Sequence, residues 1–155
     1  MVFSMWLTTL VIHLLATAFM TGLIWFVQIV HYPLLANVGA EAFPDYVARH
    51  MRGTTCVVGP AMLIELVTGA VVLLEVVRSP ALANGLLPIL AWTGMALLGV
   101  IWLSTAALQV PAWRKLQNRL DPATHRYLVR TNWIRTVAWS LRSVIVAAML
   151  VIVAR

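Results

Sequence analysis

The sequence predicts an all-α integral membrane protein, a single domain (residues 1–155) built as a bundle of four membrane-spanning helices. Hydrophobic residues make up 62% of the chain and charged residues only 10%, which is too apolar for a water-soluble surface. The apolar residues form four runs, each long enough at about 1.5 Å per helical residue to cross a hydrocarbon core of about 30 Å. Helices are required there because lipid cannot satisfy free backbone groups.

The four predicted spans follow one another with short connections. They cover residues 5–30, 55–77, 86–110 and 134–153. The first is predicted to be a retained span rather than a signal peptide, because no basic segment precedes it and the apolar run continues past Ala18 without a small-residue cleavage site. A short turn-like connection at 79–85 predicts that the second and third spans are antiparallel neighbours.

Two polar segments, residues 32–54 and 111–133, separate the paired spans. Each is predicted to hold a short interfacial helix, because Asp45 and Asp121 suit the positive N-terminal end of a helix. Gly53 is predicted to end the first of these helices.

The two halves of the chain also match at a spacing of 81 residues. Gln28 matches Gln109 and Tyr46 matches Tyr127 at this spacing (28 to 109, 46 to 127). The pattern favours two tandem helical hairpins related by an axis along the membrane normal, as in parallel-repeat transporters. Chance alignment of similar helices is the alternative.

Basic residues gather in and next to the two polar segments. They are Arg49, Arg52, Arg114, Lys115, Arg119, Arg126, Arg130 and Arg135, whereas the opposite side of the membrane has only Arg78 and Arg155. The positive-inside rule therefore predicts a multi-pass protein of the inner (cytoplasmic) membrane, with both polar segments cytoplasmic and both termini outside. The net charge of +6 then indicates contact with anionic lipid headgroups, and nucleic acid is not an expected partner.

Two ionisable residues lie within the predicted spans. Glu65 and Arg142 are both about 15 Å from the cytoplasmic ends of their helices, where a charged group needs a partner, so each is the natural partner of the other. One interpretation is a buried ion pair that fixes helix packing and has no chemical role. The other is that Glu65 accepts a proton or binds a cation, with its acidity tuned by Arg142.

Polar residues recur on one face of the first span and one face of the fourth, and both faces are predicted to point inward. The stripes are Thr9, His13, Thr17, Thr21, Gln28 and His31, and Asn132, Arg135, Trp139 and Arg142. A hydrogen bond between His13 and Glu65 is one expectation. At the cytoplasmic end we expect a funnel that leads down to Glu65 and is formed by Gln28, His31, Tyr46, His50, Gln109, His125, Asn132 and Arg135.

This funnel is the predicted functional site. An imidazole that titrates near neutral pH can act as a general base, and an arginine beside amides can stabilise an oxyanion. The predicted catalytic residues are His31, His50, Asn132, Arg135 and Glu65. The predicted substrate-binding residues are Gln28, Tyr46, Gln109, Trp139 and Arg142. Apolar walls suit a lipophilic substrate, whereas the alternative for His50 is an interfacial helix that only contacts headgroups.

Three histidines could instead bind one metal ion. Neutral imidazoles of His31, His50 and His125 suit zinc, copper or iron. Their spacing matches no compact ligand motif, and the sequence lacks the Glu-x-x-His pairs of di-iron bundles. The expected cofactor is therefore none, or a single histidine-ligated metal.

Two stretches carry a family resemblance: Val30-His31-Tyr32-Pro33-Leu34 through Phe43, Tyr46, His50 and Thr55 to Glu65, and the later Asn132 to Arg142. They resemble the anthrone-oxygenase-like family, small four-helix bacterial membrane proteins of mostly unknown function, over nearly the whole chain. Some members are associated with cofactor-independent oxygenation of polyketide anthrones, in which a base removes an acidic C–H proton and the carbanion reacts with oxygen. The resemblance implies His31 or His50 as the base, with Arg135 and Asn132 at the oxyanion.

Three functions follow as hypotheses. The first is a membrane oxidoreductase, cofactor-independent or metal-assisted, that acts on a lipophilic molecule. The second is a non-enzymatic subunit of a homo-oligomer or larger membrane complex, and the third is a small ion or proton carrier. Small residues on the third span, including Gly94 and Gly99, allow close helix association, and the expected partners are lipids, a lipophilic small molecule and further protein chains.

Overall fold

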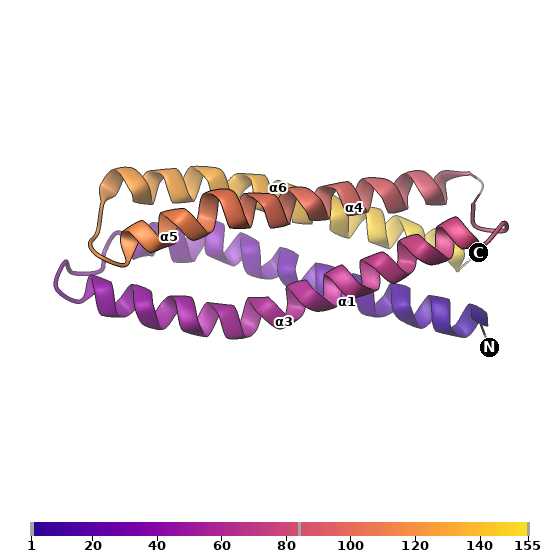
Figure 1. Cartoon of the computed structure of the whole chain (residues 1–155), viewed down its shortest axis with the longest axis horizontal. Coiled ribbons are helices and arrows are strands. Elements are labelled where there is room, and N and C mark those ends of the chain that lie inside the picture. Colours follow the sequence, from indigo (N-terminus) through magenta and orange to yellow (C-terminus); the bar gives the residue numbers. More distant parts are fainter. Residues whose placement is uncertain (1, 84, 155) are drawn as a thin grey trace.

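The structure is a computed structural model that describes residues 2–83 and 85–154, with side chains described from Met5 onward. The described chain folds into four long helical rods that lie lengthwise side by side (Figure 1). Each rod is long and apolar enough to cross a membrane. The predicted all-α four-helix architecture is therefore confirmed.

Each half of the chain contributes a kinked rod followed by an uninterrupted one. The first rod joins α1 (Val2–Phe26), a π-helical turn η1 (Val27–His31) and α2 (Tyr32–Leu35), and the second is α3 (Phe43–Arg78). The third joins α4 (Leu86–Ser104), the π-helical turn η2 (Thr105–Gln109) and α5 (Val110–Leu116), and the fourth is α6 (Pro122–Val153).

Proline accounts for the two π turns. Pro33 and Pro111 have no N–H to donate, and each ring clashes with the carbonyl four residues earlier, so the helix widens just before the proline. The two prolines are 78 positions apart (33 to 111), as are Pro44 and Pro122 (44 to 122). The structural repeat therefore has a spacing of 78 rather than 81.

The interfacial helices are not separate elements. The α3 helix runs from Phe43 through Gly53, so the predicted helix end at Gly53 is wrong. A glycine inside a helix costs only about 1 kcal/mol, and packing on both sides of it outweighs that cost. The second segment begins α6, and both uninterrupted rods extend beyond the predicted bounds of 55–77 and 134–153.

Asp121 explains why α6 starts where it does. Its carboxylate accepts hydrogen bonds from the backbone N–H groups of Thr124 at 2.9 Å and Ala123 at 3.4 Å. The Thr124 hydroxyl also donates to it. These hydrogen bonds hold the pKa of Asp121 below its usual value, and the bond from the Thr124 hydroxyl has the largest effect. Asp121 thus caps α6 by satisfying N–H groups that a helix start leaves free.

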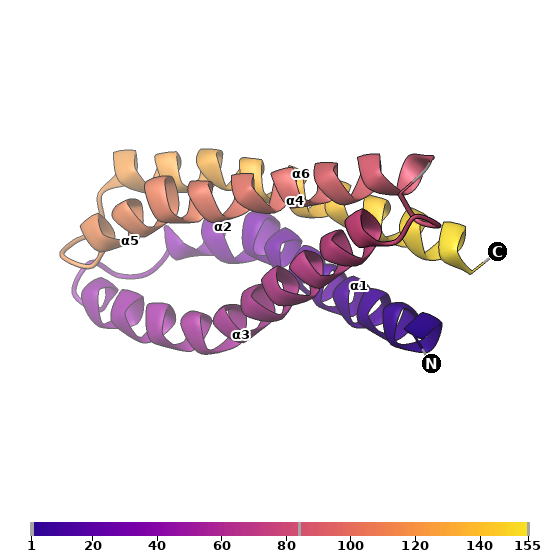
Figure 2. The same cartoon turned by 45° about the vertical axis from the view of Figure 1, so that its right-hand side comes forward.

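The rods pack in a ring in the order α1, α3, α4, α6, and each contacts the two beside it. One end of the bundle carries the connections at 36–42 and 117–121, and the other carries residues 79–83, the start of α1 and the end of α6 (Figure 1). We call the first the basic end, because the arginine-rich segments lie there. Towards the basic end, α3 stands apart from α4 and α5 in both views (Figure 2).

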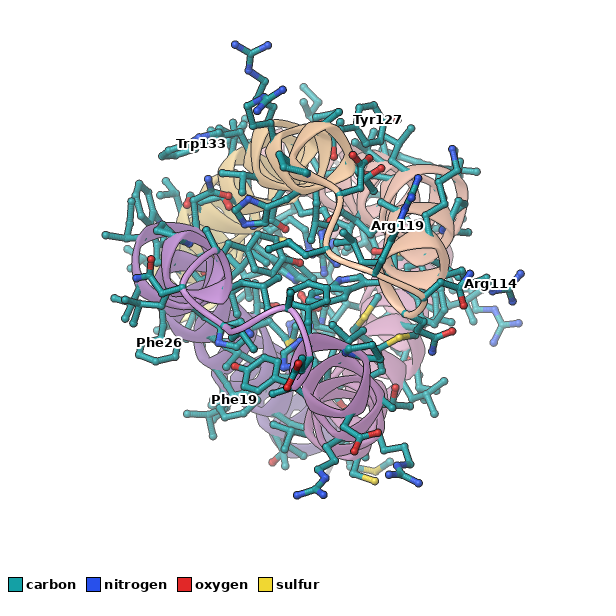
Figure 3. All side chains as sticks on the ribbon, turned by 90° about the vertical axis from the view of Figure 1, so that its left-hand side faces the viewer. Phe19, Phe26, Arg114, Arg119, Tyr127 and Trp133 are labelled. Carbon is teal, nitrogen blue, oxygen red and sulfur yellow. The ribbon has the colours of Figure 1, made fainter. Side chains whose placement is uncertain are left out.

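The outside of the bundle is apolar over its length. Phe19 and Phe26 are about half exposed on α1, and Leu103 and Val144 are exposed on α4 and α6. Viewed from the basic end, the side chains of Phe26 and Trp133 project from the outside of the bundle (Figure 3). So extensive an apolar exterior suits acyl chains and not water.

Three tryptophans mark a level along the bundle. Trp25, Trp102 and Trp133 come from α1, α4 and α6 and are each partly exposed, and the rings of Trp25 and Trp133 meet edge to face at 5.6 Å. Trp25 and Trp133 each lie roughly 30 Å from the opposite end of their rod at about 1.5 Å per residue. Such belts sit at the membrane interface, so residues beyond them are expected among lipid headgroups.

Candidate functional site

A largely apolar cavity of about 390 Å³ lies inside the bundle towards the basic end. It is bounded by α3 on one side and by α4, η2 and α5 on the other, where α3 stands apart from them. Two of its lining residues, Leu63 (55% exposed) and Trp102 (36% exposed), also reach the outer surface. The cavity therefore opens sideways, near the tryptophan level. Its polar lining includes Tyr32, His50, Thr105, Gln109 and Arg135.

Arg135 is the charged group of this cavity, and it is only 9% exposed. Its Nε donates to Asn132 Oδ1 at 3.0 Å. Its terminal nitrogens donate to the Thr105 hydroxyl and the Tyr32 phenol oxygen, both at 3.4 Å. The guanidinium carbon also lies 6.0 Å from the centre of the Trp139 ring, within cation–π range. Every one of these partners is neutral.

Gln28 and Asn132 hold Arg135 in place from behind. Asn132 donates to Gln28 Oε1 at 2.7 Å and uses its own Oδ1 to accept from Arg135. Gln28 in turn donates to the Val129 carbonyl at 3.2 Å. Both side chains are buried, and neither is among the residues that line the cavity. These two predicted site residues therefore lie outside the cavity and contact Arg135 from behind, Asn132 directly and Gln28 through Asn132.

His50 lies in an aromatic stack at the basic end of the cavity. Its ring centre is 4.4 Å from that of His31 and 4.7 Å from that of Trp113. Tyr46 is parallel to it at 6.4 Å. Among these rings, only His50 and Trp113 line the apolar cavity, so His31 and Tyr46 contact it only through His50.

A second, more open cavity of about 520 Å³ lies at the basic end, on the far side of the same histidine. It is lined by Ala42, Asp45, Tyr46, Arg49 and His50. His50 is thus shared by an apolar cavity that opens sideways and a polar one at the arginine-rich end.

Gln109 carries a buried acceptor without a partner. It lines the apolar cavity, is 1% exposed, and donates through Nε2 to the Thr131 hydroxyl at 2.8 Å. Because that hydroxyl donates its own hydrogen to the Tyr127 carbonyl, it accepts from Gln109, which leaves Oε1 as the free acceptor. Within the described chain, Gln109 Oε1 and His31 Nε2 both lack a hydrogen-bond partner, and they occupy the same last position of the two π turns.

Glu65 and Arg142 form a separate network deeper in the bundle. Their charged atoms meet at 3.1 Å, and both side chains are buried. The carboxylate also accepts from the Thr17 hydroxyl and the Trp139 indole N–H, each at 2.9 Å, and Arg142 donates to the Gly94 carbonyl. Neither charged residue lines the two cavities described above. The predicted pairing is therefore present, and its saturated contacts favour the architectural interpretation.

His13 joins this network differently from the expectation. Its Nδ1 lies 2.8 Å from the Thr68 hydroxyl and its Nε2 lies 3.4 Å from Arg142, so it contacts the arginine and not Glu65. The ring packs over Gly69, where an added Cβ would come within 3.1 Å of His13 Cε1. The funnel consequently ends at Trp139, whose indole separates the cavity from the carboxylate.

His125 does not join the other histidines. Its Nε2 lies 2.8 Å from the Tyr32 carbonyl, one of the last carbonyls of α2, which a helix end leaves free. In the described part of the chain, no three His, Cys, Asp or Glu side chains gather as a metal site requires. The predicted ligand set of His31, His50 and His125 is therefore not assembled.

The structure also adds residues that the sequence reasoning missed. Tyr32, Thr105 and Trp113 line the cavity beside the predicted His50, Gln109, Arg135 and Trp139. The one available signal was the proximity of Tyr32 to Pro33 and of Trp113 to Pro111, since π turns in helices frequently accompany functional sites.

Comparison of the chain with protein-family models, curated proteins and solved structures finds no match. The resemblance to the anthrone-oxygenase-like family consequently stays an expectation, and the function is argued from the site itself.

Proposed function

We propose that this protein is a membrane oxidoreductase that acts on a lipophilic small molecule bound in the apolar cavity. The observation that carries the proposal is the polar set at one end of that cavity: His50, Tyr32 and the buried guanidinium of Arg135. A concave, mostly apolar pocket with a few convergent polar groups is the usual form of a small-molecule site. Its sideways opening suits entry from the lipid.

His50 is the proposed general base. It would take an acidic C–H proton from the substrate, while Arg135 and Tyr32 stabilise the negative charge that develops on a substrate oxygen. Its position between the two cavities gives the proton a route to the polar side. By the family resemblance, molecular oxygen is the oxidant, so that a CH₂ group and O₂ give a carbonyl group and water.

The membrane placement is part of the same proposal. By the positive-inside rule, the basic end faces the cytoplasm of an inner membrane and both termini face outward. The cavity mouth then lies near the cytoplasmic leaflet, where the partly exposed Trp25, Trp102 and Trp133 mark the interface.

A non-enzymatic subunit of a homo-oligomer or larger membrane complex is the second candidate. The saturated Glu65–Arg142 network supports it, because that network fixes the packing of α3, α4 and α6 without using a ligand.

The test uses the full chain in neutral detergent. Bound molecules are extracted and identified by mass spectrometry, then returned to the delipidated protein while oxygen consumption is followed. We expect His50→Ala to keep binding but to lower turnover by about 10²–10⁴-fold, the usual contribution of a general base. Arg52→Gln, at an exposed position on the same helix, should leave turnover unchanged. Full turnover in His50→Ala would contradict the base assignment, and no turnover with any extracted molecule would favour the structural subunit.

A further inference from the structure

Two buried arginines on α6 differ in one respect. Arg142 meets the Glu65 carboxylate at 3.1 Å, and in the part of the chain that the structure describes this is the only salt bridge. No carboxylate therefore lies within 4.0 Å of the Arg135 guanidinium nitrogens. A charge taken out of water without a counterion is strongly unfavourable. We therefore expect an anion from outside the chain to balance the positive charge of Arg135 in the cavity.

The groups around Arg135 are arranged to receive one. The Tyr32 phenol oxygen accepts from Arg135 at 3.4 Å, so its own O–H remains free to donate. A guanidinium and a hydroxyl on one wall form a donor pair that suits carboxylate or phosphate oxygens. Most of the remaining lining, including Met20, Ile24 and Met62, is apolar.

Gln109 supplies an independent observation. Its buried Oε1 lacks a hydrogen-bond donor within the described chain and belongs to a residue that lines the same cavity. Buried acceptors are nearly always satisfied, so this atom predicts a donor on the occupant, such as a hydroxyl group.

We propose that Arg135 is the anion subsite of the cavity and that its occupant is a single-chain amphiphile with one anionic head and a neighbouring hydroxyl group. The head binds Arg135 and Tyr32, the hydroxyl donates to Gln109, and the chain lies along the apolar wall towards the sideways opening. A volume of about 390 Å³ is near the lower end of the range for ligand pockets, which favours one chain over two. This assignment concerns what the cavity binds and goes beyond the proposed function, because a carboxylate or phosphate head on Arg135 and Tyr32 is already anionic before any C–H proton is removed.

Four probes with the same twelve-carbon chain test the proposal: laurate, 2-hydroxylaurate, dodecyl phosphate and dodecanol. Dissociation constants are measured by titration calorimetry on the delipidated full-length protein in neutral detergent. We expect the anions to bind at least about tenfold more tightly than dodecanol, and 2-hydroxylaurate to bind more tightly than laurate. Preference for laurate over dodecyl phosphate would indicate a free fatty acid as the source, and the reverse a phospholipid-derived head.

Variants test whether Arg135 causes the preference for laurate over dodecanol. Arg135→Gln should bind laurate and dodecanol equally, whereas Arg130→Gln, at an exposed position on the same helix, should keep the wild-type preference. Arg135→Lys should keep part of it, because the charge remains and the forked geometry is lost. Gln109→Leu should remove only the advantage of the 2-hydroxyl group.

The proposal is overturned if wild-type protein binds dodecanol as tightly as laurate, a comparison that needs no variant to fold. It is also overturned if Arg135→Gln keeps the preference. If the protein turns over a neutral lipophilic molecule and shows no preference for anions, the enzymatic proposal is supported and the anion subsite is contradicted. If it prefers anions but shows no turnover, the anion subsite is supported and the enzymatic proposal is contradicted.

Discussion

The contrast between Arg135 and Arg142 shows how contacts decide the role of identical residues. Both lie on the inward face of α6, but Arg142 is held by Glu65 and the Gly94 carbonyl, whereas Arg135 is held by neutral groups and lines a cavity. The inward face itself was predictable from the spacing of polar residues along the helix. The Glu65–Arg142 pair was also predictable, because both residues lie at a similar depth in their helices. The neutral partners of Arg135 were not, because they depend on how η2 and α2 pack against α6.

At this scale we predict that Arg142→Gln lowers the free energy of unfolding by about 3–5 kcal/mol, because it leaves the buried Glu65 carboxylate without a counterion. Adding Glu65→Gln should recover a large part of the loss, since an uncharged pair no longer carries that penalty. Reversible unfolding in mixed micelles, read as a double-mutant cycle, measures both effects. A loss in Arg142→Gln no larger than in the exposed control Arg130→Gln would contradict the structural role of the pair.

At the scale of elements, the two π turns place the ends of the kinked rods. Pro33 and Pro111 force each rod to widen, which moves His31 and Gln109 into positions where each keeps an unpaired polar atom. Both prolines are plain in the sequence and lie 78 residues apart. The predicted spacing of 81 residues instead matched Gln109 to Gln28 rather than to His31. The equivalence of His31 and Gln109 appears only when the turns themselves are compared.

We predict that Pro111→Ala lets the third rod continue as a regular α-helix. The restored hydrogen bond should raise the free energy of unfolding by up to about 3 kcal/mol, while rotation of Gln109 weakens binding of the hydroxylated probe. Pro122→Ala is the matched control, because proline at the first position of a helix costs little. Equal effects of the two changes on stability and on binding would show that the π turn does not position Gln109.

A second prediction at this scale concerns the start of α6. The hydrogen bond from the Thr124 hydroxyl, together with weaker ones from backbone N–H groups, holds the pKa of Asp121 below 3.8 in the folded chain. The carboxylate therefore stabilises the helix start fully at pH values above the pKa that Asp121 has in the unfolded chain. This stabilisation is lost as the pH falls through the lower pKa of the folded chain. The Thr124 amide proton, followed by NMR, should titrate with a midpoint below 3.8. It should not titrate in Asp121→Asn, and a midpoint at or above the ordinary value would contradict the cap.

For the whole molecule, hydropathy and length were enough to predict four rods and their antiparallel neighbours. Three features depended on tertiary contacts and were not predictable. Gly53 stays helical within a packed rod, His125 turns to the Tyr32 carbonyl rather than to other histidines, and α3 stands apart from α4 to leave a cavity. Of the predicted site residues, His50, Gln109, Arg135 and Trp139 line the apolar cavity, and their roles stay a prediction. The other predicted residues lie outside that cavity, because their side chains are held by contacts elsewhere in the bundle.

The orientation of the whole bundle yields one more prediction. In a Cys56→Ser background, a cysteine at Ala83 should react with a membrane-impermeant maleimide added to intact cells, because the topology proposed from the positive-inside rule places residues 79–83 outside. A cysteine at Ala123, at the basic end, should react only after the membrane is opened. The opposite pattern would invert the proposed topology.

A crystal structure grown from a lipid mesophase tests the role of the cavity most directly. Elongated density should fill the space between α3 and α4, with its polar end within about 3 Å of the Arg135 guanidinium and the Tyr32 hydroxyl. A cavity occupied by the protein's own side chains, or an α3 closed against α4 with Arg135 turned to a carboxylate, would contradict a ligand site there.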